Sequence, residues 1–333
     1  MKKKSQEFIT ILYGFAVLLV VFGHSHPLHS DYPGFLQRIT TFVYMFHMPL
    51  FFFIAGILTA YTANNRNIGQ WWKLKVKKLI LPYVVLTLAA WLPKCALGAY
   101  MNDNMEISAT NFVGMLLIPR EGIWGHFWFI PVYLVITLLC ACLYKNFTNK
   151  SAIIKICWGG GWISLGIILT FYPIPVRWFA IEDISIEFVY ALLGMFLSDF
   201  IIKNKEILFQ WYAGAVAGIV AFILYAHGFG TVGYKLTGVL MIYLMLTLAV
   251  VLSKHEMRVI KYIGTHAFTI YIYSWPIQAV TEFVVVVILK LQWYVTYPCM
   301  FLVVLLGPLI IYEIYMKYLP KNKFLDRMIG VKQ

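Results

Sequence analysis

Charged residues are scarce in this chain, and no long polar stretch interrupts it. Asp, Glu, Lys and Arg make up 12% of the 333 residues, and hydrophobic residues make up 61%. A soluble domain carries about twice that charged fraction. Because no polar stretch is long enough to build a separate soluble domain, we expect one membrane domain over residues 1–333, with a cytoplasmic tail at about 317–333.

Cysteine is also sparse, and its spacing indicates no site. The five cysteines lie in apolar segments without the spacing of metal ligands: Cys95, Cys140, Cys142, Cys157 and Cys299. They are expected to be small buried residues rather than disulfides. The sequence shows no internal repeat of the kind that forms the inverted halves of a transporter.

Apolar runs long enough to cross a bilayer core of about 30 Å recur along the whole chain. They predict an all-α, polytopic integral membrane bundle of about ten transmembrane helices. The outer connections then fall at 26–41, 100–125 and 173–184. The predicted spans are 8–25, 42–62, 79–99, 126–144, 153–172, 185–202, 207–226, 235–253, 263–288 and 295–316.

The net charge of +13 would suggest nucleic acid as a partner of a soluble protein, but its distribution indicates a membrane topology instead. With ten spans, six of the 27 Lys and Arg residues fall on one side and the remaining 21 on the other. The six are Arg38, Lys94, Arg120, Arg177, Lys235 and Lys290. The positive-inside rule then places both termini in the cytoplasm, and the expected partner is membrane lipid rather than nucleic acid.

Histidines gather at the outer ends of the predicted spans. The stretch "VVFGHSHPLHS", residues 20–30, ends the first span, and His47 and His126 lie near the outer ends of two others. Ionisable groups at membrane depth are costly and usually have a function or a partner. We therefore expect these three helix ends to converge on one polar pocket.

The histidines of residues 20–30 allow three interpretations: a metal site, a proton-transfer site or a polar collar at the water interface. Zinc needs three or four well-placed ligands, whereas Pro27 interrupts the helical spacing of His24, His26 and His29. No metal is therefore expected, even with Asp31 as an additional oxygen donor. The polar collar is the favoured interpretation for His26 and His29.

His24 differs because Tyr13 precedes it by eleven residues on the same helix. That spacing is close to three turns, or about 16 Å along one face. An imidazole titrates near neutral pH and is able to take a proton from a sugar hydroxyl. The pair therefore predicts one side of a reaction channel, with His24 as a general base for acyl transfer.

Six segments together resemble the acyltransferase 3 family of membrane proteins. They are "FAVLLVVFGHS", "FVYMFHMPLFFFIAGILTA", "KLKVKKLILPYVV", "GHFWFIPVYLV", "FVYALLGMFLSD" and "YIGTHAFTIYIYSWPIQ". They follow one another in the family's order from about residue 8 to 285, and "FHMPLFFF" is the most specific. The chain is most similar to short, single-module members that resemble fucose 4-O-acetyltransferases.

The resemblance implies an O-acetyltransferase in the bacterial cytoplasmic membrane. Such an enzyme moves an acyl group, usually acetyl, from cytosolic acyl-CoA to a hydroxyl of a cell-surface or lipid-linked glycan. By position His24 is the candidate catalytic residue, and His47 and Trp128 are candidates to line its pocket. Lys75 and Lys78 are the candidates for the CoA phosphates. Acetyl-CoA is the expected donor, and a homo-oligomer or a polysaccharide-assembly partner stays open.

Three further residues complete the expected site. His126 opens a span near His24, and Glu121, like Glu182 and Asp183, is either a contact for sugar hydroxyls or a solvated loop charge. Ser274 stands where many family members have a histidine, and Tyr13 stands where they have Arg or Lys. The difference at Tyr13 keeps a catalytically inactive member open as an alternative. The other alternative is a ten-helix transporter in which the histidines relay protons.

Overall fold

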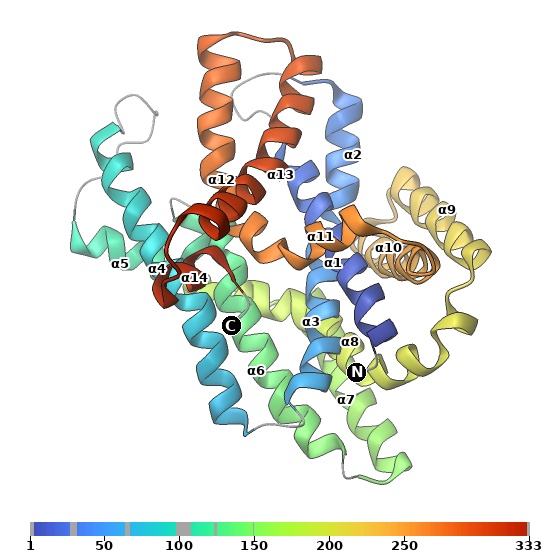
Figure 1. Cartoon of the computed structure of the whole chain (residues 1–333). Helices are drawn as coiled ribbons and strands as arrows, with labels where there is room; N and C mark the ends of the chain where they lie inside the picture. Colours follow the sequence, from blue (N-terminus) through green and yellow to red (C-terminus); the bar gives the residue numbers. More distant parts are fainter. Residues whose placement is uncertain are drawn as a thin grey trace. The chain divides into compact units, whose positions relative to one another are not determined.

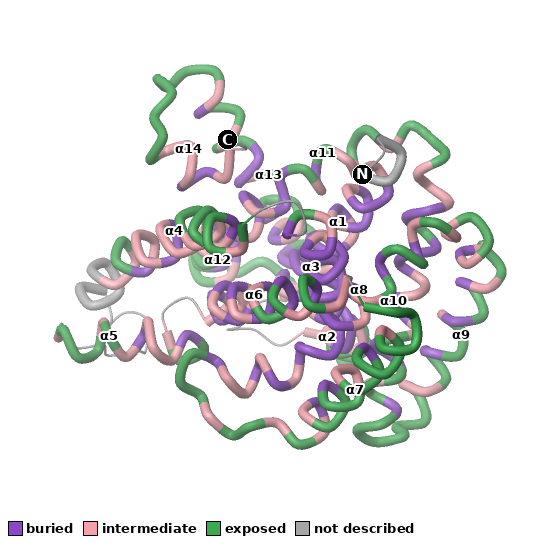
Figure 2. The backbone as a smooth tube through the Cα atoms, turned by 90° about the horizontal axis from the view of Figure 1, so that it is seen from below, coloured by how far each residue is buried: buried purple, intermediate pink, exposed green. Residues whose placement is uncertain are grey.

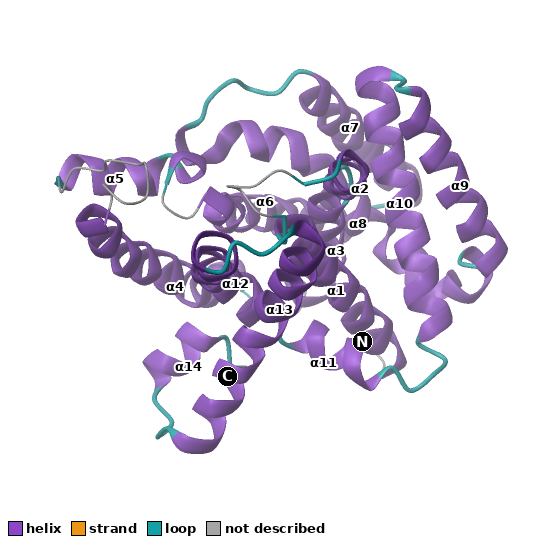
Figure 3. Cartoon of the chain, turned by 90° about the horizontal axis from the view of Figure 1, so that it is seen from above, coloured by secondary structure: helices purple, strands orange, loops and turns teal. Residues whose placement is uncertain are grey.

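The computed structural model describes residues 3–26, 32–63, 67–97, 108–122, 125–148 and 150–331, without the side chains of 3–6 and 92–97. Throughout these ranges the chain forms helices joined by turns, and it contains no strand (Figure 3). The predicted all-α fold is confirmed. Its elements are α1 (Lys3–His24), α2 (Gly34–Tyr44), α3 (His47–Ala63), α4 (Ile68–Leu97), α5 (Ala109–Leu117), η2 (Pro119–Glu121), η3 (Gly125–Trp128), α6 (Phe129–Thr148), α7 (Ala152–Phe171), η4 (Trp178–Ala180), α8 (Ile181–Leu208), α9 (Trp211–His227), α10 (Gly230–Leu252), α11 (Arg258–Thr265), α12 (Ala267–Glu282), η5 (Phe283–Ile288), α13 (Trp293–Tyr318) and α14 (Lys323–Ile329).

The ten predicted spans fall on helices, although 42–62 and 263–288 each cross a short break between two helices, so the chain is a multi-pass membrane protein. In the described part of the chain, eight helical segments are long and apolar enough to cross a bilayer. They are Glu7–His24, Gly34–Ala63, Gly125–Thr148, Ala152–Phe171, Trp178–Leu208, Gly230–Leu252, Ala267–Ile288 and Trp293–Tyr318. The predicted span 207–226 is α9, a shorter apolar helix. The span 79–99 lies on α4 and extends past the last residue of that helix whose side chain is described.

Two outer connections are more ordered than the sequence predicted. Residues 26–41 and 100–125 were expected as loops, but α2 starts at Gly34 and α5 at Ala109. α2 follows Pro33 and is amphipathic, and it buries Thr40 and Val43 while Phe35 and Ile39 remain exposed. α5 has an N-cap, because the Ser108 hydroxyl accepts a hydrogen bond from the Asn111 amide at 3.0 Å.

The chain divides into two compact units, and the divisions fall inside α3 and α8. The first unit consists of residues 1–54 and 197–322. Within it α1 contacts α2, α10, α11, α12 and α13, while α9 lies beside α10 and α12 beside α13 (Figure 1). The apolar side chains of α1 are therefore buried by several helices at once, and buried residues dominate α1 in Figure 2.

Glycines allow the helices of the first unit to approach closely. A Cβ on Gly264 of α11 would lie 1.9 Å from the Thr10 carbonyl oxygen, and one on Gly14 would lie 2.5 Å from the Ile260 carbonyl oxygen. α1 and α11 therefore meet backbone to backbone. Gly214 and Gly218, four residues apart on α9, face the side chains of Thr247 and Leu244 on α10, so this GxxxG spacing serves packing inside the first unit.

The second unit consists of residues 55–196 and 323–333. Here α4 packs on α5, α6 and α14, and α6 packs on α7. Trp71 of α4 is buried against Ala63 and Ala141. A Cβ on Gly56 would lie 2.0 Å from the Ala191 carbonyl oxygen, so the end of α3 lies directly on α8. α7 is apolar but mostly exposed, as expected for a helix that faces lipid.

Candidate active site

His24 is the last residue of α1, and the carbonyl groups around it are satisfied by side chains. The last carbonyls of a helix have no partner inside the helix. The Ser25 hydroxyl donates to the Val21 carbonyl, and the Tyr297 hydroxyl donates to the Phe22 carbonyl at 2.8 Å. Gly23 is the residue directly before His24, and its carbonyl accepts two bonds. These interactions fix the backbone that carries His24.

The two donors to the Gly23 carbonyl lie three and 21 residues after it in the sequence. The Tyr44 hydroxyl reaches it from α2 at 2.7 Å, and His26 Nδ1 reaches it from the following turn at 2.7 Å. A carbonyl oxygen has two lone pairs, so it accepts both. The His26 ring also stacks on Tyr32, with centroids 5.4 Å apart. His26 thus caps a carbonyl at the C-terminal end of α1, a role that the polar collar expected from the sequence does not include.

Three rings surround the half-buried His24 imidazole within the first unit. Its ring centroid lies 5.7 Å from Tyr44, 5.9 Å from Trp275 and 6.4 Å from His47. They come from the end of α2, the middle of α12 and the start of α3. The expected neighbourhood of His24 and His47 is therefore present, and it is built mostly of aromatic rings.

His47 is buried, with 6% of its surface exposed, and its protonation pattern follows from its contacts. Its Nδ1 lies 3.1 Å from the Val43 carbonyl oxygen, which only accepts hydrogen bonds. Nδ1 therefore carries the proton, and in the neutral ring Nε2 is the acceptor. The ring lies 5.0 Å from Tyr44. A second imidazole with a defined tautomer thus stands beside His24.

Tyr13 and Ser274 also belong to the first unit. Tyr13 lies on α1 with its ring centroid 6.0 Å from Phe51, and the unbroken helix confirms the spacing of three turns to His24. Ser274 is buried on α12, and its hydroxyl donates to the Tyr271 carbonyl at 3.1 Å. Trp275, the next residue, is the one that contacts His24. His29 and Asp31 lie outside the described residues.

His126, Trp128 and Glu121 belong to the second unit. The His126 ring lies 4.5 Å from Phe127. Trp128 is buried, and the Arg120 guanidinium lies 4.2 Å above its ring, within the range of a cation–π contact. Glu121 accepts a hydrogen bond from Arg177 at 2.7 Å.

The outer acidic residues named from the sequence meet in one pocket of the second unit. Its volume is about 400 Å³. It is lined by Ile118, Arg120, Glu121, Arg177, Glu182, Asp183 and Ile186. Asp183 is buried and takes a two-pronged hydrogen bond from Arg120, whereas the Glu121–Arg177 pair is exposed. A small pocket with three carboxylates and two guanidinium groups suits a ligand rich in hydroxyl groups.

Lys75 and Lys78, the candidates for the donor phosphates, have different surroundings on α4. Lys78 is exposed. Lys75 is half-buried, and its ammonium lies 4.3 Å from the Trp71 ring and 4.7 Å from the Tyr133 ring. Lys75 precedes the predicted span at 79, and burial lowers its pKa to about 7. Its ammonium is therefore easier to deprotonate than that of an exposed lysine.

Sequence reasoning missed Tyr44, Trp275 and Tyr297. Tyr44 lies three residues before His47, which is a helical spacing, so its proximity to that histidine was readable. Trp275 and Tyr297 lie more than 250 residues from His24 along the chain, and no local pattern links them. Among the described residues, no group of three His, Cys, Asp or Glu side chains is placed to hold a metal ion.

This combination, a multi-pass helical bundle with a histidine held at a helix end, fits a membrane-embedded transferase rather than a soluble enzyme. Residues 6–313 match the family described as "Acyltransferase domain", the acyltransferase 3 family. Because the match covers nearly the whole chain, the protein belongs to this family of membrane acyltransferases.

The chain is also similar to proteins named "Glucans biosynthesis protein C". Those of Escherichia coli strain SMS-3-5 / SECEC and of Escherichia coli O1:K1 / APEC are each 25% identical to it over 142 residues. The alignment covers 41% of this chain and 36% of each relative, so it spans about a third of the relatives' length. No solved structure matches the chain.

Proposed function

We propose that the protein transfers an acyl group, with acetyl the expected one, from cytosolic acyl-CoA to a glycan hydroxyl. The acceptor is a cell-surface or lipid-linked glycan, and the enzyme resides in the bacterial cytoplasmic membrane. Membership in the acyltransferase family supports the reaction class. The glycan is in keeping with the name of the relatives, which refers to glucan biosynthesis.

The observation that carries the proposal is the position of His24. Side-chain hydrogen bonds to the carbonyls of Phe22 and Gly23 fix the backbone that carries its imidazole. The rings of Tyr44 and Trp275 lie beside it and leave it half-buried. A general base needs this combination of fixed position and partial desolvation.

The proposed step is a direct acyl transfer. His24 takes the proton of the acceptor hydroxyl while its oxygen attacks the thioester carbonyl carbon. The carbon–sulfur bond breaks, and the CoA sulfur leaves and takes the proton from the His24 imidazolium. The products are an ester and free CoA, and the imidazole returns to its neutral form. The step requires no metal ion or redox cofactor.

The charges of two groups of residues suggest where the acyl-CoA donor and the glycan acceptor bind. Lys75 and Lys78 lie on the basic part of α4, on the side that the charge distribution assigns to the cytoplasm, and they suit CoA phosphates. The pocket that contains Glu121, Glu182 and Asp183 suits sugar hydroxyls, because carboxylates accept hydrogen bonds from them.

The test uses membrane vesicles that contain the protein, with radiolabelled acetyl-CoA supplied at the cytoplasmic face. A crude lipid-linked and surface-glycan fraction serves as the acceptor. We expect label in the glycan that is released by mild alkali, as an ester is. If folded protein transfers nothing from acetyl-CoA or longer acyl-CoAs, the proposal is wrong. The transporter or the inactive family member then takes its place.

A further inference from the structure

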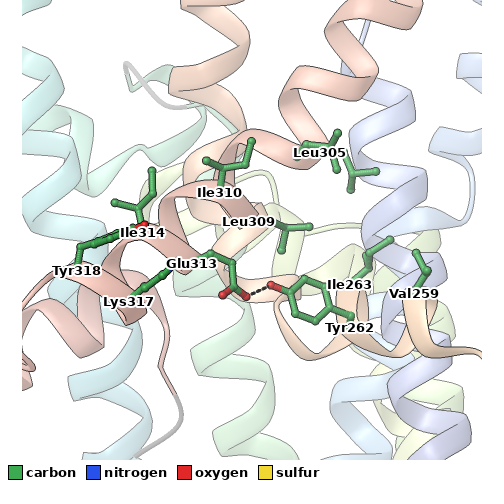
Figure 4. A pocket seen from close by; sticks show the side chains of 11 residues that line it. Val259, Tyr262, Ile263, Leu305, Leu309, Ile310, Glu313, Ile314, Lys317 and Tyr318 are labelled. Atoms are coloured by element: carbon green, nitrogen blue, oxygen red, sulfur yellow. Dashed lines mark hydrogen bonds between the residues drawn. The ribbon is translucent and has the colours of Figure 1, made fainter.

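A groove on the first unit is used neither by His24 nor by the proposed transfer. It lies between α11 and the C-terminal half of α13 and has a volume of about 630 Å³ (Figure 4). Its apolar wall includes Val259, Leu305, Leu309 and Ile310, and its polar lining includes Tyr262, Glu313 and Lys317. The groove is thus apolar for most of its length and charged in one part.

The charged groups lie at one end of the groove. Leu305 and Lys317 are twelve residues apart on α13, a rise of about 18 Å. Apolar residues occupy the first part of this distance, while Glu313 and Lys317 occupy the last turn and a half. The apolar residues Leu305 to Ile310 cover a rise of about 7.5 Å, so they contact part of a hydrocarbon chain. The groove therefore suits a ligand with a hydrocarbon tail and a polar head.

The polar end faces the side of the membrane where inner-leaflet headgroups lie. Arg258, Lys261 and Lys317 belong to the basic residues that the positive-inside rule assigns to the cytoplasm. The charge distribution therefore orients the ligand, with its head at the cytoplasmic surface and its tail toward the bilayer centre.

Glu313 selects the chemistry of the head. Its carboxylate accepts a hydrogen bond from the Tyr262 hydroxyl, as Figure 4 shows. Burial and this hydrogen bond raise the pKa of Tyr262, so the phenol stays protonated and remains the donor. Within the described part of the chain Glu313 makes no ion pair. A carboxylate beside hydrocarbon gains most from a cation that also donates hydrogen bonds.

Lys317 adds the opposite charge one turn away. Residues four apart on a helix have their Cβ atoms about 5–6 Å from each other. The Lys317 ammonium lies 5.1 Å from the Tyr318 ring. A carboxylate and an ammonium therefore lie one turn apart at the polar end of the groove, which matches the opposite charges of a zwitterionic head that carries an ammonium and a phosphate.

We propose that this groove binds phosphatidylethanolamine from the inner leaflet. The lipid ammonium donates to Glu313, its phosphate contacts Lys317, and one acyl chain lies along Leu309, Ile310 and Leu305. Phosphatidylglycerol has no cation for Glu313. The nitrogen of phosphatidylcholine carries only methyl groups and donates no hydrogen bond. The groove therefore distinguishes these three lipids, independently of acyl transfer.

The experiment uses the full-length protein, delipidated in detergent and titrated with one of the three lipids, all with the same acyl chains. Native mass spectrometry counts bound lipid, and thermal unfolding reports stabilisation. We expect phosphatidylethanolamine to bind at least tenfold more tightly than either other lipid. Equal binding of phosphatidylglycerol or phosphatidylcholine would overturn the proposal.

Two variants and a control test the assigned contacts. Glu313→Gln keeps the shape of the side chain but removes its negative charge. It should abolish the preference for phosphatidylethanolamine over phosphatidylcholine. Lys317→Gln should weaken binding of both lipids at least threefold while keeping that preference. Lys321→Gln removes a basic residue outside the groove. It should change neither the affinity for the two lipids nor the preference between them. If Glu313→Gln fails to fold, the lipid affinities of Lys317→Gln and Lys321→Gln are compared to test the proposal. The proposal is wrong if these two variants bind alike.

Discussion

The Tyr44 ring lies where a side chain at position 23 would be. A Cβ on Gly23 would come within 2.7 Å of a Tyr44 ring carbon, and the Tyr44 hydroxyl donates to the Gly23 carbonyl at 2.7 Å. The absence of a side chain at 23 therefore lets α2 reach the end of α1. The residue after Gly23 is His24, so this contact positions the candidate catalytic imidazole.

Gly23→Ala should displace Tyr44 and with it His24. Overpacking of a close contact costs about 1–3 kcal/mol of stability, and a displaced base loses more rate than stability. We expect kcat for acyl transfer to fall at least tenfold, with a lower midpoint of thermal unfolding in detergent. Gly160→Ala on α7 is the matched control, because a Cβ there meets nothing within 4 Å. Equal activities of the two variants would contradict the assigned contact.

The contact between α1 and α11 should be intolerant of any side chain. A Cβ on Gly264 would lie 1.9 Å from the Thr10 carbonyl oxygen and 2.8 Å from the Gly14 amide nitrogen, and neither is a flexible side-chain end. Gly264→Ala should therefore greatly reduce the yield of folded protein. The measurement is the monodisperse fraction after size-exclusion chromatography, with Gly161→Ala as the control at an open helical position. Comparable yields would show that the helices separate readily.

The two ion pairs of the second unit should differ in their contribution to stability. Asp183 is buried with 8% of its side chain exposed, whereas the side chains of Glu121 and Arg177 are 52% and 74% exposed. Asp183→Asn breaks a two-pronged interaction with Arg120 and should cost about 1–3 kcal/mol. Glu121→Gln should cost less than about 1 kcal/mol, since exposed pairs contribute little.

Chemical denaturation of the purified protein in mild detergent compares these two variants with the wild type. Asp183→Asn must lower the free energy of unfolding more than Glu121→Gln does. A larger loss for Glu121→Gln would mean that the exposed pair, rather than the buried one, secures the outer segment of the second unit.

Donor binding should depend on pH through Lys75, whose pKa is lowered to about 7. The ammonium is protonated below that pKa and neutral above it, so its attraction for CoA phosphates falls as pH rises from 6 to 8. We expect the apparent KM for acyl-CoA to rise severalfold over this interval. Arg stays charged, so Lys75→Arg should flatten the rise. An identical pH dependence in both proteins would remove Lys75 from donor binding.

Lys75 also affects stability with a defined sign. Its pKa is lowered in the folded state and lies near 10.5 when unfolded, so the unfolded chain binds more protons between these values. The stability contribution of this group should therefore increase as pH rises above about 7. Lys75→Met, which removes the titration, should show a smaller increase in unfolding midpoint between pH 7 and 9.

Much of the fold was readable from the sequence because a bilayer demands long apolar helices. The run that ends at His24 and the span that includes His47 were both predicted correctly. α2 was missed because its mixed polar and apolar surface resembles a loop. The nine-residue helix α5 was also missed, although Ser108 carries a capping signal.

The site was readable only in part, because its parts come from distant segments. His24 and His47 are polar residues in apolar helices, so they could be identified as candidates from the sequence alone. Trp275 and Tyr297 are aromatic residues in aromatic-rich spans, so nothing distinguishes them before the helices are packed. In the sequence Lys75 is one of several equivalent lysines. Only its contacts with Trp71 and Tyr133 in the folded protein distinguish it from the others.

The most direct test of the proposed mechanism is the kcat of His24→Ala in the labelled acetyl-CoA assay, measured beside His227→Ala. His227 is an exposed histidine at the outer end of α9, and it should keep wild-type activity when replaced. A general base contributes about 10²–10⁴-fold, so His24→Ala should lose at least a hundredfold while remaining folded. If folded His24→Ala transfers acetyl groups as fast as His227→Ala, His24 is not the base and the proposed mechanism is wrong.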